Sequence, residues 1–266
     1  PLTENFNYLR FLFLLSALVL KYLFLFRWGK FYIASFVFYI AITFYPDSYL
    51  IRSSFASSIA LLGFWVILSG RSAGYFFLSI ILASLFHISA LVLLPLWWLR
   101  NITISKSLGF TLLGVIIGLG AIGVGHITVG FLSTVFSVDG AIVSRLIEYS
   151  GSKYSVSAGL IRVSVLIYTI IVFAFIFYRD NIASRIRYYD FIATILLFSL
   201  FILLGFSDFI ILADRIFRLT AFFFAIALGL ILYSLKKRDQ TIVSTLVIAV
   251  CNIAPYYTDA GPYMLL

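Results

Sequence analysis

Long apolar segments separated by short polar connections run through almost the whole chain, and they constrain its fold more than any other feature. They cover residues 11–26, 31–45, 53–68, 74–99, 107–125, 158–178, 191–205, 217–235 and 241–255. A helix needs about 20 apolar residues to cross a bilayer, and in lipid a helix satisfies its own backbone hydrogen bonds. Since 63% of the residues are hydrophobic and only 11% are charged, the sequence predicts an all-α helical bundle in a membrane.

We expect one integral-membrane domain over residues 1–266 with about eight to ten membrane segments. The chain begins at Pro1 and shows no signal-peptide pattern. This start is compatible with an N-terminally truncated fragment that lacks upstream helices. The single cysteine, Cys251, excludes an intramolecular disulfide and a cysteine metal cage.

Clusters of Lys and Arg between the apolar segments orient the chain, because short cytoplasmic loops of membrane proteins are enriched in these residues. The connections "YRDNIASRIRYYD" and "SLKKRDQ" are therefore expected in the cytoplasm. Residues 126–157, an extracytoplasmic loop, and 206–216 then face the other side. The formal charge of +9 lies largely in such clusters, so it indicates cytoplasmic loops and no nucleic-acid partner.

The segment 74–99 decides the topology of the N-terminal half. As one straight helix it would be about 39 Å long, and a single crossing would place the basic residues Arg27 and Arg71 outside. Two half-length helices, 74–86 and 88–99, would instead enter and return on the cytoplasmic side as a re-entrant hairpin. That hairpin places Lys21 with the cytoplasmic cations and leaves the outer side with equal numbers of cations and carboxylates.

The outer side then collects the polar residues that need an explanation. They are Arg52, Arg145, Arg162, Arg215, Arg218, Asp47, Glu148, Asp208, Asp214, His87, Tyr149 and Tyr154. Ionisable groups within or at the edge of a membrane are costly and are candidates for function. Several guanidinium groups that face one cavity suit a diphosphate, because each binds phosphate oxygens bidentately and stays charged.

Each of these residues also has a structural interpretation. Asp214 and Arg218 stand four apart on one helix and can form a supporting ion pair. Arg52 and Arg162 can anchor the ends of spans by snorkelling, and His87 can bond a neighbouring helix. Two histidines without a nearby carboxylate cluster give no metal site, and no motif indicates a cofactor.

The block "YPDSYLIRSSFASSIALLGFWVILSGRSAGYFFLSIILASLFHISALVLLPLWWL" resembles the EpsG-like family of Wzy-type polymerases of O-antigen, capsule and exopolysaccharide. The shared elements are Arg52 opening a helix ahead of Ala56, the turn Ser69-Gly70-Arg71, and Phe86-His87-Ile88-Ser89-Ala90. Family members commonly carry Gln after the arginine, where this chain has Ser53. "RLIEYSGSKYS" and "DRIFRLTAFFFAIALG" extend the resemblance more weakly.

The resemblance implies a glycosyltransferase with a GT-C-like helical architecture in the bacterial inner membrane and an active site facing the periplasm. It would transfer a growing glycan from undecaprenyl diphosphate to the non-reducing end of another lipid-linked repeat unit, as in lipopolysaccharide biosynthesis. The implied partners are undecaprenyl-diphosphate-linked oligosaccharides, membrane lipids, a chain-length regulator and a flippase.

In this mechanism Arg52, Arg215 and Arg218 hold the diphosphate, and His87 orients or deprotonates the acceptor hydroxyl or bonds a phosphate. The further substrate-binding candidates are Arg145, Arg162, Glu148, Tyr149, Tyr154 and Asp214. An O-antigen ligase would use the same kind of site. A lipid-linked oligosaccharide flippase or an acyltransferase with an intramembrane histidine remains an alternative.

Overall fold

The structure is a computed structural model that describes residues 2–27, 31–44, 50–122, 163–206, 210–235 and 240. Regular structure in these ranges is helical throughout. The helices are α1 (Leu2–Phe26), α2 (Tyr32–Tyr39), η1 (Ile40–Phe44), α4 (Ile51–Leu68), α5 (Ala73–Phe86), η2 (Ile88–Leu93), α6 (Leu96–Leu99), α7 (Lys106–Ile122), α10 (Val163–Phe177), α11 (Arg179–Ala183), α12 (Tyr189–Gly205), α13 (Ile210–Thr220) and α14 (Phe222–Ser234).

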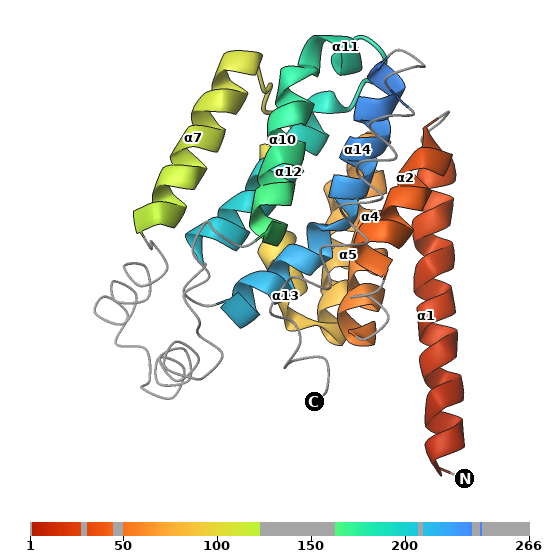
Figure 1. The fold of residues 1–266 in the computed structure, drawn as a ribbon. Helices are drawn as coiled ribbons and strands as arrows, with labels where there is room; N and C mark the ends of the chain where they lie inside the picture. Colours follow the sequence, from red (N-terminus) through yellow and green to blue (C-terminus); the bar gives the residue numbers. More distant parts are fainter. Residues whose placement is uncertain are drawn as a thin grey trace.

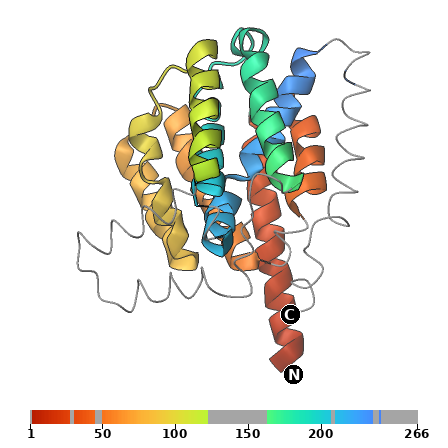
Figure 2. The ribbon, with the colours of Figure 1, turned by 60° about the vertical axis from the view of Figure 1, so that its left-hand side comes forward.

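The longer helices stand side by side, with α1 at one edge of the bundle and α7 at the opposite edge (Figure 1). The short helix α11 lies at one end of the bundle and α13 lies across the other, and we name these the α11 end and the α13 end. The N-terminal part of α1 projects beyond the other described helices at the α13 end (Figures 1 and 2).

Two helical stretches, Asn7–Phe26 and Ile51–Leu68, are long and apolar enough to cross a membrane. A third is added if the bent pair α13 and α14 counts as one span. The other apolar helices, α5, η2 with α6, α7, α10 and α12, are shorter. The predicted class, a helical membrane protein, is confirmed at this level, whereas the count of membrane segments stays a prediction.

Small residues let α1 and α4 approach closely. Ser58 Oγ reaches the Ala17 carbonyl oxygen at 3.2 Å, and Phe13 meets Phe55 edge to face with ring centroids 5.0 Å apart. Ser53, Ser54, Ala56, Ser57, Ser58 and Ala60 are all buried along α4. Small side chains are common where membrane helices pack, because they allow the backbones to come together.

Gly229 allows a similar approach between α14 and α2. A Cβ atom at Gly229 would overlap the Ser35 hydroxyl and would lie 3.0 Å from the Ser35 backbone nitrogen. Nearer the α13 end, Tyr39 and Phe222 pack edge to face with centroids 5.3 Å apart. The helix α14 is therefore enclosed by other helices, and its residues from Phe222 to Leu232 are all buried.

The segment 74–99 is a helical hairpin, as the charge pattern predicts. Trp97 packs on Phe76 with ring centroids 5.5 Å apart, and Trp98 lies 5.9 Å from Phe77. Residues near the start of α5 thus meet residues at the end of α6. This requires segment 74–99 to reverse direction near its own midpoint. The break falls at His87, between the last residue of α5 and the first of η2. The predicted turn is confirmed.

Helices α13 and α14 differ from what the sequence predicts for this part of the chain. We expected one continuous span over 217–235 after an outer stretch at 206–216, but α13 already begins at Ile210 and meets α14 with a bend of 46°. At the bend, the Thr220 hydroxyl donates to the Phe217 carbonyl at 3.0 Å and lies 2.7 Å from Ser199 Oγ of α12. Such polar insertions are a common cause of helix bends.

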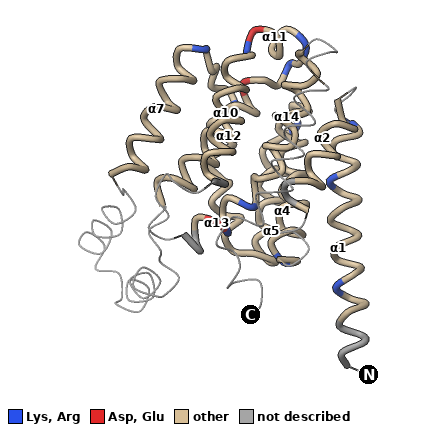
Figure 3. Tube along the Cα trace, viewed as in Figure 1, with Lys and Arg blue, Asp and Glu red and all other residues tan. Residues whose placement is uncertain are grey.

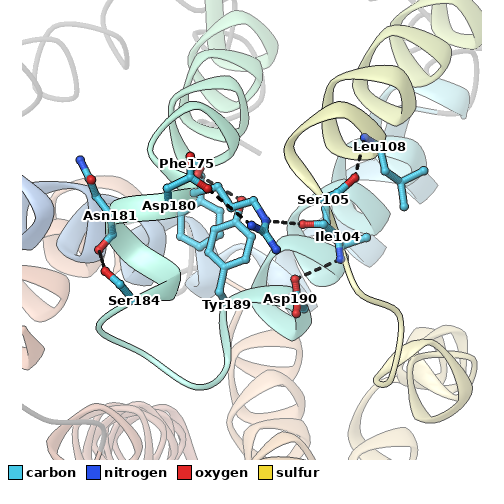
Figure 4. A network of polar contacts seen from close by, with 10 residues as sticks. Ile104, Ser105, Leu108, Phe175, Asp180, Asn181, Ser184, Tyr189 and Asp190 are labelled. Atoms are coloured by element: carbon cyan, nitrogen blue, oxygen red, sulfur yellow. Dashed lines mark hydrogen bonds and ion pairs between the residues drawn. The ribbon is translucent and has the colours of Figure 1, made fainter.

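A polar network at the α11 end fastens α7 to α11 and α12 (Figure 4). Asp190 Oδ1 accepts the Ile104 amide at 3.0 Å, and Arg179 Nε donates to the Ile104 carbonyl at 2.7 Å. The amide and the carbonyl of Ile104 are therefore both hydrogen-bonded to side chains from α11 and α12. The ring of Tyr189 stacks on Phe175 beneath them, with centroids 4.9 Å apart.

Candidate functional site

His87 lies at the tip of the hairpin, at the α13 end. Its backbone is extended, with φ −151° and ψ 107°, which ends α5 and redirects the chain. The His87 amide still donates to the Ala83 carbonyl at 3.0 Å, while its carbonyl accepts the Ala90 amide at 2.9 Å. The backbone on both sides is thus held by helical bonds. The Nδ1 atom of the ring is buried and has no hydrogen-bond partner in the described structure.

Helix α13 brings arginine to this tip. It packs against η2, α4 and α12, and its apolar face carries the buried residues Ala213, Ile216 and Phe217. Arg215 is exposed, and the packing of α13 on η2 brings it to the end of the bundle at which His87 lies. Two of the predicted catalytic residues, far apart in the sequence, therefore lie at the same end of the bundle.

Arg218 and Asp214 form the ion pair that their spacing predicts. Arg218 Nε lies 2.7 Å from Asp214 Oδ2, and the side chains are 23% and 41% exposed. A partly exposed pair of this kind contributes little to stability. Arg215 and Arg218 are three residues apart and therefore share one side of α13. The ion pair with Asp214 thus holds the Arg218 guanidinium on the same side of the helix as Arg215.

Arg52 lies in the first turn of α4 and lines a pocket of about 250 Å³. The pocket is lined by Phe13, Ile51, Arg52, Phe55, Leu85 and Phe86. Its aromatic residues interlock, with Phe55 and Phe86 at 4.7 Å between centroids. One guanidinium group beside an otherwise apolar lining suits an amphiphile such as a lipid phosphate.

The pocket connects Arg52 to the hairpin tip, because Phe86 immediately precedes His87. His87, Arg215 and Arg218 are not among its lining residues. The structure thus brings Arg52, His87 and the α13 arginines to one end of the bundle, and their convergence on a single cavity stays a prediction. Next to Arg52, the hydroxyl of Ser53 is buried and has no hydrogen-bond partner in the described structure.

Several predicted residues lie outside the described parts of the chain. They are Arg145, Arg162, Glu148, Tyr149 and Tyr154 in and beside the 126–157 loop, together with Asp47 and Asp208. Their proposed roles stay predictions. Within the described ranges, no three His, Cys, Asp or Glu side chains gather as a metal site would require.

The predicted position of Lys21 is wrong. Its charge was assigned to the cytoplasmic side, but the side chain is 1% exposed and lies inside the bundle. Its Nζ atom donates to Tyr39 Oη at 3.4 Å and to Ser54 Oγ at 3.3 Å, and it lies 4.9 Å from the Tyr39 ring centroid. The signal available in the sequence was a single lysine inside an otherwise apolar run.

Charged residues are otherwise found mainly at the two ends of the described bundle (Figure 3). Lysines, arginines and aspartates surround α11 and the start of α7, and arginine with aspartate marks α13. This separation fits a helical protein whose middle lies in lipid.

A comparison with known families settles the wider relationship. The family model of the EpsG family matches residues 1–259, which is nearly the full length of 266 residues. The chain belongs to the EpsG family. No curated protein and no solved structure matches it.

Membership in the EpsG family makes this chain a polysaccharide polymerase-type membrane protein. The match covers α1 to α14 and includes the hairpin, Arg52 and α13. The resemblance drawn from the sequence is therefore confirmed at the level of the EpsG family.

Proposed function

We propose that this EpsG-family protein is a Wzy-type glycosyltransferase that polymerises lipid-linked oligosaccharide repeat units. The donor is a glycan on undecaprenyl diphosphate, and the acceptor is the non-reducing end of another lipid-linked repeat. The observation that carries the proposal is the packing of α13, which bears Arg215 and Arg218, on η2, which begins directly after His87, at the same end as the Arg52 pocket. Cationic groups and a proton acceptor are what transfer from a lipid diphosphate needs.

The transfer itself can be written with groups of this end of the bundle. The acceptor hydroxyl oxygen attacks the anomeric carbon of the donor glycan, and the bond from that carbon to the diphosphate oxygen breaks. The electron pair leaves with undecaprenyl diphosphate, whose added charge Arg52, Arg215 and Arg218 stabilise. The hydroxyl proton passes to the imidazole of His87, which afterwards releases it to water.

The pocket under Arg52 supports a lipid carrier as the donor. A diphosphate bound by Arg52 would leave the first isoprene units of the carrier over Phe13, Phe55 and Phe86. Burying apolar isoprene surface there contributes binding energy in addition to the charge interaction. Arg145 and Arg162 are second candidates for the diphosphate, and Glu148, Tyr149, Tyr154 and Asp214 are candidates for the sugars.

The positive-inside rule supports the membrane orientation. The α11 end carries Lys106, Arg179 and Arg185 and is assigned to the cytoplasm. The α13 end then faces the periplasm, and the hairpin of α5, η2 and α6 is re-entrant from the cytoplasmic side. We expect the complete bundle to be GT-C-like, with about eight to ten membrane segments, in the bacterial inner membrane.

The test is a reaction of the purified full chain in detergent with a defined undecaprenyl-diphosphate-linked repeat unit, followed by gel analysis. Polymerase activity gives a ladder of increasing length and one undecaprenyl diphosphate released for each bond formed. A flippase joins no sugars under these conditions. A ligase gives a single transfer to a lipid A-core acceptor and no ladder. Either of those two results would replace the proposal.

A further inference from the structure

Two arginines share one tryptophan near the α11 end of the bundle. The guanidinium carbon of Arg27, just after α1, lies 5.0 Å from the ring centroid of Trp65 on α4. The guanidinium carbon of Arg71 lies 4.7 Å from the same centroid. Both arginine residues are exposed. Neither has a carboxylate partner among the ion pairs of the described structure.

The backbone holds Arg71 in this position. The Gly70 amide donates to the Ile67 carbonyl and the Arg71 amide donates to the Val66 carbonyl, each at 3.1 Å. Gly70 has φ +66°, in the left-handed region that favours glycine. This pattern is a Schellman motif, which closes α4 and turns the next residue back over its last turn. Arg71 is thereby directed onto Trp65, and its position does not depend on a flexible loop.

Arg27 is attached to the last turn of α1, since its amide donates to the Leu23 carbonyl at 3.4 Å. The guanidinium carbons of Arg27 and Arg71 lie 5.0 Å and 4.7 Å from the same ring centroid. Their separation is therefore below the Debye length of about 10 Å at 0.1 M salt. Their repulsion is therefore not screened away. Cation–π contact with Trp65 offsets part of this cost, and an anion bound by both guanidinium groups would offset the rest.

Exposed apolar side chains lie near the two arginines, as expected at a surface that contacts lipid. On the same two helices, Phe26 is 55% exposed and Leu62, one turn before Trp65, is 43% exposed. Tryptophan is enriched at the level of lipid headgroups, and basic sites between helices at the cytoplasmic side bind anionic headgroups. An anion at this position would therefore carry acyl chains that cover the exposed apolar side chains.

Other cations at this end of the bundle differ from the pair. Arg100 lies 3.3 Å from the Trp97 centroid, without a second cation on that ring. Arg185 donates to the Tyr233 carbonyl, and Arg179 bonds the Ile104 carbonyl and contacts Asp180. Among the described residues, Trp65 is the ring that carries two guanidinium groups.

We propose that Arg27, Trp65 and Arg71 form a binding site for the phosphate of an anionic glycerophospholipid from the surrounding leaflet. The two guanidinium groups bind phosphate oxygens, the indole lies beside the glycerol, and the acyl chains run along α1 and α4. The bound lipid joins the end of α1 to the end of α4, the helix that carries Arg52. This site is independent of the glycan chemistry at the α13 end.

The test is native mass spectrometry of the full chain, stripped of lipid in detergent and titrated with phosphatidylglycerol, cardiolipin or zwitterionic phosphatidylethanolamine. We expect both anionic lipids to bind more tightly than phosphatidylethanolamine. Arg27→Gln and Arg71→Gln should each weaken anionic binding about fivefold. Arg100→Gln is the matched control, since it removes one cation stacked on tryptophan, and it should leave the affinity unchanged.

A second variant tests the role of the turn. Gly70→Ala keeps both charges but places a Cβ at a positive φ, so it should displace Arg71 and weaken phosphatidylglycerol binding like Arg71→Gln. Melting temperatures in detergent establish that each variant is folded. Unchanged binding in both arginine variants would overturn the proposal. So would equal losses in Arg100→Gln, or equal affinities of the wild-type chain for phosphatidylglycerol and phosphatidylethanolamine.

Discussion

The Nζ atom of Lys21 lies 3.3 Å from the hydroxyl oxygen of Ser54, so a buried amino group of α1 bonds the first turn of α4. Ser54 follows Arg52 by two residues, so the contact helps to fix the position of Arg52 beside the pocket. Tyr39 adds a second oxygen at 3.4 Å. Burying a polar group is costly unless it is hydrogen-bonded, which indicates that this lysine has a specific role.

We predict that Lys21→Met lowers polymer formation by at least about tenfold while the protein still folds. The methionine fills a similar volume but cannot bond Ser54, so the first turn of α4 and Arg52 can shift, and small misplacements are costly for catalysis. The measurement is the initial rate of ladder formation together with the melting temperature in detergent. Ser16→Ala, which removes an exposed hydroxyl on the same helix, is the control. A full wild-type rate in Lys21→Met would show that the buried amino group is not needed to position Arg52.

The second prediction concerns the hairpin tip. His87→Ala should lower the rate of ladder formation by about 10² or more, as expected when a general acid or base is lost, and Arg215→Gln should lower it through loss of diphosphate stabilisation. Ser84→Ala, one turn before His87 on α5, removes only a hydroxyl that bonds its own helix and should retain activity. Ladders of normal length and amount from folded His87→Ala would remove the imidazole from the mechanism.

The helical class and the hairpin could be predicted because their signals, apolar length and the distribution of charge along the chain, can be read without knowing which helices pack together. Apolar length predicts helices in lipid, and the charge balance across 74–99 predicts a return at His87. The Asp214–Arg218 pair follows likewise from a four-residue spacing within one helix. Such signals need no knowledge of the neighbouring helices.

The bend near Thr220 and the burial of Lys21 depend on partners that are distant in the sequence. Thr220 meets Ser199 of α12, and Lys21 meets Tyr39 of α2 and Ser54 of α4. A hydropathy pattern registers a threonine or a lysine in an apolar run but does not indicate which helix will face it. The placement of Arg215 at the same end of the bundle as His87 has the same origin, since it follows from the packing of α13 on η2.

The third prediction concerns the close contact of α14 with α2. Gly229→Ala should lower the stability by about 1–3 kcal/mol, because the added methyl group overlaps the Ser35 hydroxyl and approaches its backbone. Gly114→Ala on α7 is the matched control: nothing lies within 4 Å of its Cβ position. That variant should be neutral or stabilising, as alanine favours helix. Melting temperatures in detergent compare the two, and equal temperatures would contradict the described contact.

The fourth prediction concerns the network at the α11 end. Asp190→Ala removes the acceptor of the Ile104 amide, a residue that is only 2% exposed, and an unsatisfied buried donor costs about 1–3 kcal/mol. We expect a lower melting temperature and faster proteolysis between α6 and α7. Asp180→Ala removes a carboxylate that is 75% exposed and lies 3.5 Å from Arg179. Its effect should stay within about 0.5 kcal/mol. Equal effects of the two variants would show that the Asp190 bond does not fasten this connection.

The fifth prediction concerns the side of the membrane on which the hairpin begins and ends. In a Cys251→Ser background, which removes the single cysteine, Ser72→Cys and Asn101→Cys place thiols at exposed positions before α5 and after α6. A re-entrant hairpin returns the chain to its starting side, so a membrane-impermeant maleimide should reach both thiols only after the inner membrane is opened. Arg215→Cys at the α13 end should react in cells whose inner membrane is intact. A single crossing would instead place the thiols at 72 and 101 on opposite sides. His87 would then lie in the middle of one span, away from the periplasmic surface at which a lipid-linked acceptor must reach it.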